Sequence, residues 1–173
     1  MLLCANAALE ENKQKINELN VFPVPDGDAG TNMSLTMNSA AIELGRKQTD
    51  TVGAVADCAA RALLRGARGN SGVILSLLFR GVAKSLKGRE TASAAEFAAA
   101  VSAGVDAAYK AVMKPAEGTI LTVSRLGAQA AVAFAKDSTD FEGMLDALLA
   151  AAREAPADPQ NINPVLRRAG VVD

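Results

Sequence analysis

Residues 19–33 of this chain read LNVFPVPDGDAGTNM, with two carboxylates set among small residues. In an extended segment the side chains of Asp26 and Asp28 point to the same side. Two like charges at that separation repel each other unless a cation lies between them. Oxygen ligands favour a hard ion such as Mg²⁺ or Ca²⁺ over zinc. The turn therefore predicts a divalent cation at this pair of carboxylates.

A helix is expected to begin directly after this turn. Its free N–H groups and positive dipole end suit a phosphate, so metal and phosphate together indicate nucleotide chemistry. Taken alone, an Asp- and Gly-rich run is also typical of a solvated turn. An EF-hand is excluded because the sixth position is Thr31 rather than glycine and the twelfth is Met37 rather than glutamate.

Two more segments carry glycine-rich turns. Residues 65–72 read RGARGNSG, and a helix expected from Ser71 would offer a second phosphate-binding N-terminus. This segment is neither a P-loop nor a Rossmann fingerprint, and a plain helix–helix corner is an equal alternative. Residues 114–123 read KPAEGTILTV, where Thr119 and Thr122 are expected to share a helix face. The alternative there is an ordinary capped helix start.

Composition excludes several classes of function. The chain has 173 residues, enough for one domain with its own hydrophobic core. With 18 basic and 19 acidic residues and 3% aromatics, nucleic-acid binding is not expected. The absence of histidine removes Ser-His and Cys-His catalytic pairs and histidine-ligated metals. No apolar run approaches a membrane span, so we expect a cytoplasmic protein. Cys4 and Cys58 are expected to be buried reduced thiols, with a disulfide as the alternative.

The fold is predicted to be all-α, because strong helix formers fill most segments. Val101, Val105, Ala108 and Val112 recur at the spacing of an amphipathic helix. Short connections favour antiparallel neighbours, as in a bundle. Eight helices are expected, at about 1–18, 33–46, 50–65, 71–87, 94–113, 118–136, 140–154 and 162–169.

Taken together, the segments at 19–33, 66–76 and 114–123 resemble the nucleotide-binding domain of the dihydroxyacetone kinase L-subunit family. Within that superfamily the chain is most similar to the N-terminal ATP-binding domain of bacterial fatty acid kinase A subunits. The resemblance implies a closed antiparallel bundle of about eight amphipathic helices, with the nucleotide bound at one end by the loops between helices.

The resemblance also assigns roles to residues. Asp26 and Asp28 would hold two Mg²⁺ ions that bridge the phosphates of ATP or ADP, and Asn20 stands near the place of a third metal-binding aspartate. The Thr119–Leu121 region would line the adenine pocket, with Thr119 and Leu121 as its named contacts. The phosphates would be contacted by Thr31, Asn32, Asn70, Ser71 and Gly72.

The expected activity is phosphorylation of a fatty acid to an acyl phosphate. A carboxylate acceptor has a pKa of about 4–5, so it is already ionised and needs no general base. Alternatives are a dihydroxyacetone-type (glycerone) kinase subunit and a non-catalytic nucleotide-binding regulator. Residues 1–173 are expected to be one nucleotide-binding domain, excised from the N-terminal part of a longer kinase, with Asp173 in an unfinished nucleotide loop. The implied partners are a fatty-acid carrier protein and the remaining kinase domains, through which a homodimer could form. No large apolar pocket with a polar head-group clamp is expected, and the domain alone should not act efficiently on free fatty acid.

Overall fold

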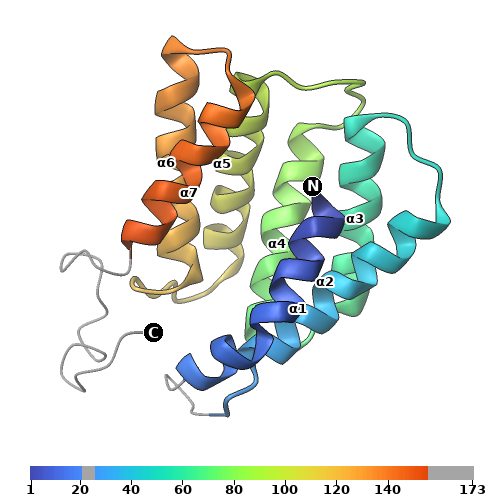
Figure 1. The fold of residues 1–173 in the computed structure, drawn as a ribbon, viewed down its shortest axis with the longest axis vertical. Helices are drawn as coiled ribbons and strands as arrows, with labels where there is room; N and C mark the ends of the chain where they lie inside the picture. The colour runs from blue at the N-terminus through green and yellow to red at the C-terminus, as the bar shows by residue number, and fades with distance from the viewer. Residues whose placement is uncertain (21–25, 156–173) are drawn as a thin grey trace.

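The computed structural model describes residues 1–20 and 26–155, and this part of the chain is all-helical. Within these residues there are seven helices and no strand, which confirms the predicted fold class (Figure 1). The helices are α1 Leu2–Leu19, α2 Ala29–Arg46, α3 Val52–Gly66, α4 Gly69–Ser85, α5 Ala94–Ala111, α6 Ile120–Asp137 and α7 Phe141–Glu154.

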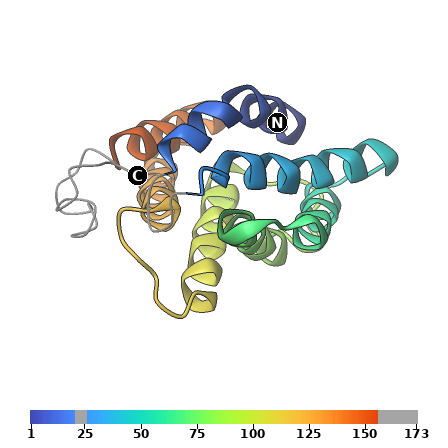
Figure 2. The same cartoon turned by 90° about the horizontal axis from the view of Figure 1, so that it is seen from below.

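Consecutive helices run in opposite directions, and each packs on the next one along the chain (Figure 1). Helix α2 also packs on α4. Because the chain alternates in direction, α2, α4 and α6 all begin at the same end of the bundle, which Figure 2 views from below. The eighth helix expected at 162–169 falls outside the described residues. This arrangement gathers helix N-termini that are far apart in sequence.

Two helices begin earlier than the sequence predicted. Helix α2 begins at Ala29 rather than 33, because Asp28 takes the N-cap position and its carbonyl accepts the N–H of Asn32 at 2.8 Å. Helix α4 begins at Gly69 rather than 71. Gly69 has a φ of +56°, a conformation that glycine adopts at little cost and that lets the chain enter the helix two residues sooner.

Glycines allow helix backbones to touch at two crossings. A Cβ on Gly81 of α4 would lie 2.5 Å from the Cα of Gly104 on α5, and one on Gly104 would lie 2.5 Å from the Leu78 carbonyl oxygen. At the other crossing, a Cβ on Gly30 of α2 would overlap the Lys13 carbonyl oxygen of α1. Since real Cβ atoms do not approach so closely, these positions have no room for a side chain.

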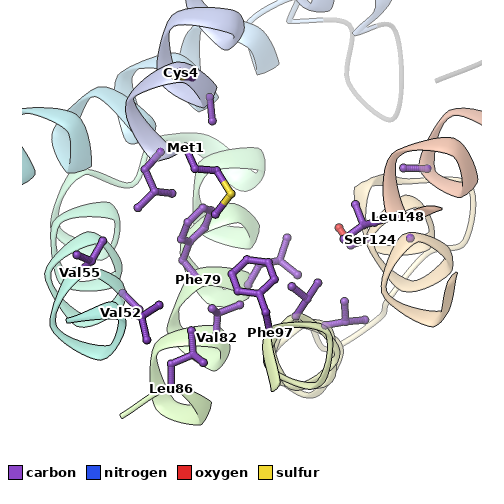
Figure 3. Close-up of a pocket in the computed structure, with 18 of the residues that line it drawn as sticks. Met1, Cys4, Val52, Val55, Phe79, Val82, Leu86, Phe97, Ser124 and Leu148 are labelled. Atoms are coloured by element: carbon purple, nitrogen blue, oxygen red, sulfur yellow. The ribbon is translucent and has the colours of Figure 1, made fainter. Parts of the chain in front are cut away.

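The apolar core is divided into two clusters with a cavity between them. One cluster joins α2 and α3 around Met37 and Leu63, and the other joins α5, α6 and α7 around Met144. Between them lies an apolar cavity of about 790 Å³. Figure 3 shows Val52, Val55, Phe79 and Val82 on one side of it, Leu148 and Ser124 on the other, and Phe97 below.

Among the described residues that line this cavity there is no charged side chain, so it is not the large apolar pocket with a polar head-group clamp whose absence the sequence predicted. The walls of the cavity come from all seven described helices, and many of the fully buried residues around them are alanines. Small side chains let neighbouring helices pack closely in pairs, but they do not reach across to the opposite side of a ring of helices. The centre of the bundle is consequently left unfilled.

Both cysteines are free, as predicted, but only Cys58 is buried; Cys4 is exposed on α1, so its predicted burial is wrong. Helix α1 has no fully buried residue, which explains the exposure of Cys4. Among the described helices, none is both long and apolar enough to cross a membrane.

Candidate nucleotide and metal site

A pocket of about 510 Å³ opens at the end of the bundle where α2, α4 and α6 begin. Its walls come from the first turns of these three helices, from the last turn of α1 and from Ala155 after α7. The N-terminus of a helix carries unpaired N–H groups and about half a positive charge. Helix ends of this kind make the pocket suited to a polyanion such as a chain of phosphates.

Asp26 and Asp28 both line this pocket, and both residues are exposed. Gly27 between them has a φ of +60°, which forms the turn that presents them. Within the described residues there is no group of three or more acidic, cysteine or histidine side chains that could hold a metal. A pair of carboxylates fits Mg²⁺, because this ion usually binds one or two carboxylates and completes its shell with water and substrate phosphates.

Asn20 supports this turn from the end of α1. Its Oδ1 accepts the backbone N–H groups of Asp28 and Ala29, at 3.2 and 3.1 Å. An amide oxygen has two acceptor sites, and both are directed at the start of α2. The side chain thus caps the helix that carries the predicted metal ligand Asp28, while its own role as a metal ligand stays a prediction.

Thr31 faces α1 rather than the pocket. Its N–H donates to Asn17 Oδ1 at 3.0 Å, and Asn17 Nδ2 donates to the Thr31 hydroxyl at 2.9 Å. The backbone N–H can only donate, so it fixes which end of the Asn17 amide is the oxygen. Asn17 thus joins α1 to the first turn of α2 through two hydrogen bonds. The sequence did not predict this role, because no motif around Asn17 indicates a partner 14 residues away.

The first turn of α4 contributes Gly69, Asn70 and Ser71 to the pocket. Their N–H groups precede the first hydrogen bond of the helix, in which the Gly72 N–H donates to the Arg68 carbonyl at 3.0 Å. The prediction that the Gly72 N–H faces a phosphate is therefore wrong. Since α4 begins two residues earlier than predicted, the free N–H groups shift to Gly69, Asn70 and Ser71.

Gly72 instead lets α4 pack against α2. It is buried, and a Cβ at this position would overlap the hydroxyl of Thr36. That hydroxyl donates to the Asn32 carbonyl at 2.6 Å and accepts the N–H of Arg68 at 3.1 Å, so it joins the first turns of both helices. The contact holds Asn32, which lines the pocket, beside the start of α4.

The start of α6 forms the third wall. Thr119 is the N-cap of the helix, and its hydroxyl accepts the Leu121 N–H at 3.3 Å. Thr119 and Thr122 both line the pocket, whereas Leu121 is 2% exposed and packs in the interior away from it. The hydroxyl of Thr122 is bound to the carboxylate of Glu117.

The environment of Glu117 favours its charged form. Partial burial raises the pKa of its carboxyl, but hydrogen bonds from Thr122, Arg125 and Tyr109 lower it more, so the pKa lies below the ordinary value of 4.5. The same contacts from Glu117 and Tyr109 raise the pKa of the Arg125 guanidinium. Glu117 therefore carries its negative charge at neutral pH.

The structure thus brings most of the predicted site residues to one pocket. Thr31, Gly72 and Leu121 do not line it, and Asp173 lies outside the described residues. Those that line it are Asn20, Asp26, Asp28, Asn32, Asn70, Ser71 and Thr119.

Known proteins with similar sequences cover the whole chain. It is 49% identical over its full length to "Protein YloV" of Bacillus subtilis (strain 168) and 46% identical to "Uncharacterized protein SSP1546" of Staphylococcus saprophyticus. In both cases it spans 31% of the relative's length. Residues 23–173 match the family of DAK2 domains, which are nucleotide-binding subunits of the dihydroxyacetone kinase type. The chain therefore belongs to the DAK2 domain family.

Proposed function

We propose that this domain binds ATP together with Mg²⁺ and supplies the phosphoryl donor of a kinase that converts carrier-bound fatty acid into acyl phosphate. One observation carries the proposal: two exposed carboxylates and the N-termini of α2, α4 and α6 line a single pocket. Its volume of about 510 Å³ is within the range of small-molecule sites, about 300–1,000 Å³.

Phosphoryl transfer depends on positioning and charge neutralisation more than on covalent chemistry by the protein. Mg²⁺ held by Asp26 and Asp28 would neutralise phosphate charge and orient the phosphate chain. The N–H groups of Asn70 and Ser71, which precede the first hydrogen bond of α4, would donate to phosphate oxygens. Asn20 and Asn17 hold the first turn of α2 in position for these contacts.

A fatty acid is the acceptor best matched to a chain without histidine. Its carboxylate is already a nucleophile at neutral pH, with a pKa of about 4–5, whereas the hydroxyl of dihydroxyacetone needs a base to remove its proton. A dihydroxyacetone-type subunit is the second candidate, since its nucleotide half would have the same chemistry. A non-catalytic regulator would bind nucleotide equally well but would not turn it over.

Nucleotide titrations of the intact chain test the binding half of the proposal. With Mg²⁺ present, ADP at a hundredfold excess over its Kd should stabilise the fold by about 2.7 kcal/mol. Chelation of Mg²⁺, Asp26→Ala or Asp28→Ala should remove most of this gain. Asp57→Asn is the matched control, because it breaks an exposed ion pair with Arg61 on α3, outside the pocket. Unchanged MgADP affinity in both alanine variants would overturn the metal assignment.

An assay with radiolabelled ATP tests the choice of acceptor. The chain alone should form little acyl phosphate from free oleate, because productive alignment of acceptor and phosphorus requires the carrier and the remaining kinase domains. Adding both should produce acyl phosphate in proportion to the amount of this domain. Rapid turnover of free oleate by the chain alone would contradict the division of labour, and no turnover in the full mixture would favour the regulator.

A further inference from the structure

A network of polar side chains surrounds Glu117 in the connection between α5 and α6. One carboxylate oxygen, Oε1, accepts the hydroxyl of Tyr109 at 3.0 Å. The other, Oε2, accepts the hydroxyl of Thr122 at 2.6 Å and the guanidinium of Arg125 at 2.8 Å. Tyr109 comes from α5 and the other two from α6, so the carboxylate ties the connection to both helices at once.

The hydrogen bonds of this network can be oriented in only one way. The Thr122 hydroxyl accepts the backbone N–H of Gly118 at 2.8 Å, so its own hydrogen is directed to Glu117. Likewise Arg125 Nε donates to the Tyr109 oxygen at 3.3 Å, which directs the phenolic hydrogen to Glu117. An ionised carboxylate only accepts, so it completes both chains. Without it, both hydroxyls lose the acceptor of their hydrogen.

The network controls one wall of the pocket although Glu117 is not part of that wall. Gly118, Thr119 and Thr122 line the pocket, whereas Tyr109, Glu117 and Arg125 do not. Gly118 has a φ of +78°, and its N–H is bound to Thr122. The backbone that leads into the N-cap of α6 is therefore held by a hydroxyl whose own position depends on the carboxylate.

We infer that Glu117 is a positioning residue for nucleotide recognition: it sets the Gly118–Thr119 turn, and through this turn the wall that contacts the nucleoside. The inference rests on the proposed function. Asp26 and Asp28 lie with the starts of α2 and α4, where metal and phosphates are proposed. The α6 wall adds the apolar side chain of Ile120 to the pocket, which suits a nucleoside base. Glu117 consequently acts on the affinity for the nucleoside more than on the affinity for the phosphates.

A merely structural role would have a different signature. The Glu117 side chain is 46% exposed and its partner Arg125 31% exposed, and ion pairs in such positions contribute little to stability. Thr122, by contrast, is 1% exposed and lines the pocket. The loss of its acceptor would therefore leave a buried hydroxyl unpaired in the pocket wall. The variant should fold with nearly normal stability and recognise nucleotide less well.

Calorimetric titration of the intact chain with MgADP and with Mg-pyrophosphate separates the two halves of the pocket. Glu117→Gln should weaken MgADP about tenfold, equivalent to about 1.4 kcal/mol, and change Mg-pyrophosphate less than about twofold. Tyr109→Phe, which removes one donor, should weaken MgADP by about threefold. Glu43→Gln is the matched control: Glu43 pairs with Lys47 and Arg65 near the other end of α2, and its loss should change neither ligand.

Each outcome separates this inference from the proposed function. Equal weakening of both ligands by Glu117→Gln, or no weakening of either, would overturn the positioning role while MgADP binding by the unaltered chain still supported the proposed function. An unaltered chain that binds Mg-pyrophosphate as tightly as MgADP has no nucleoside wall, which would also overturn the inference. If Glu117→Gln does not fold, as judged by circular dichroism, the ratio of the two affinities in Tyr109→Phe decides the question.

Discussion

The polar pocket and the apolar cavity share the wall of α6, where Val123 lines both, yet they are made in different ways. The pocket is formed by turns and helix starts, so its chemistry comes from backbone N–H groups, two carboxylates and a few hydroxyls. The cavity is formed by helix faces that carry valine, leucine and phenylalanine side chains (Figure 3). The pocket thus depends on helix ends and the turns before them, and the cavity on the side chains of helix faces.

This difference predicts a separation of effects. Pocket residues such as Asp26 and Asp28 are exposed and make few packing contacts, so their substitution should change affinity with little effect on stability. Residues around the cavity carry the core, so their substitution should change stability with little effect on nucleotide affinity. The substitutions below test that separation, beginning with the largest expected effect.

Gly81→Ala should give the largest loss of stability, about 2–3 kcal/mol, because its methyl group would meet the backbone of Gly104. The two glycines precede Val82 and Val105, which line the cavity, so this contact belongs to the cavity wall. MgADP affinity, corrected for the folded fraction, should be unchanged.

Gly45→Ala on α2 is the matched control: a Cβ there meets nothing within 4 Å, and alanine should stabilise the helix by about 0.5–1 kcal/mol. Urea denaturation measures both variants, and equal effects would show that the α4–α5 contact is not tight.

Gly72→Ala should lower both the stability and the affinity for MgADP, unlike the substitutions that change only one of them. The added methyl would displace the Thr36 hydroxyl, which joins the first turns of α2 and α4. We expect a loss of stability of about 1–2 kcal/mol together with weaker MgADP binding, since both turns line the pocket. Denaturation and calorimetry on the same preparation measure the two effects. Loss of affinity at full stability would restore the original prediction that Gly72 faces the phosphates.

Gly72 also shows what sequence could and could not predict. Asp26 and Asp28 were predicted from turn chemistry, which is local, whereas Asn70 and Thr119 were assigned through the family resemblance; all four line the pocket. The assignment of Gly72 failed because it depended on knowing where α4 begins to better than two residues. That start is set by the conformation of one residue, Gly69.

Features that depend on distant contacts were missed for a physical reason. Glu117 is joined to Tyr109 across a connection between two helices, and Asn17 to Thr31 across a turn, and neither pairing has a spacing rule. The cavity depends on how seven helices are arranged around a centre, which periodicity does not encode. The all-α class and the approximate helix ranges were predictable because amphipathic repeats and helix formers are distributed along the whole chain.

Asn20→Ala should cause an intermediate loss of stability, because it removes the acceptor for two N–H groups at the start of α2. A cap of this kind is worth about 1 kcal/mol, measured as a shift in the denaturation midpoint. Asn20→Asp keeps the acceptor oxygen and should keep the stability. If Asn20 also ligates the metal, the aspartate variant should bind Mg²⁺ more tightly in the presence of ADP, and an unchanged Mg²⁺ affinity would limit the residue to capping.

Ala56→Leu should raise stability by about 0.5–2 kcal/mol, the range of cavity-filling substitutions, because Ala56 lines the apolar cavity and the larger side chain can enter it. MgADP affinity should not change, since Ala56 does not line the polar pocket. Thermal denaturation with and without MgADP measures both quantities. A lower melting temperature would mean that the cavity is narrower in solution, and a change in affinity would mean that the two hollows are coupled through α6.

The smallest effect concerns the charge of Glu117. Its pKa is lowered in the folded protein, since the hydrogen bonds from Thr122, Arg125 and Tyr109 outweigh its burial. A lowered pKa means that the contribution to stability is fully present above the unfolded-state value of 4.5 and is lost as the pH falls through the lower folded-state value. The difference in stability between the unaltered chain and Glu117→Gln should therefore be constant between about pH 5.5 and 8 and shrink below about pH 4.5. It should be below about 1 kcal/mol throughout, because the pair is largely solvated. Urea denaturation of both proteins across this range measures the difference. A difference that changed between pH 6 and 8 would show that another group titrates with the network, and the one-way orientation of its hydrogen bonds at neutral pH would then be wrong.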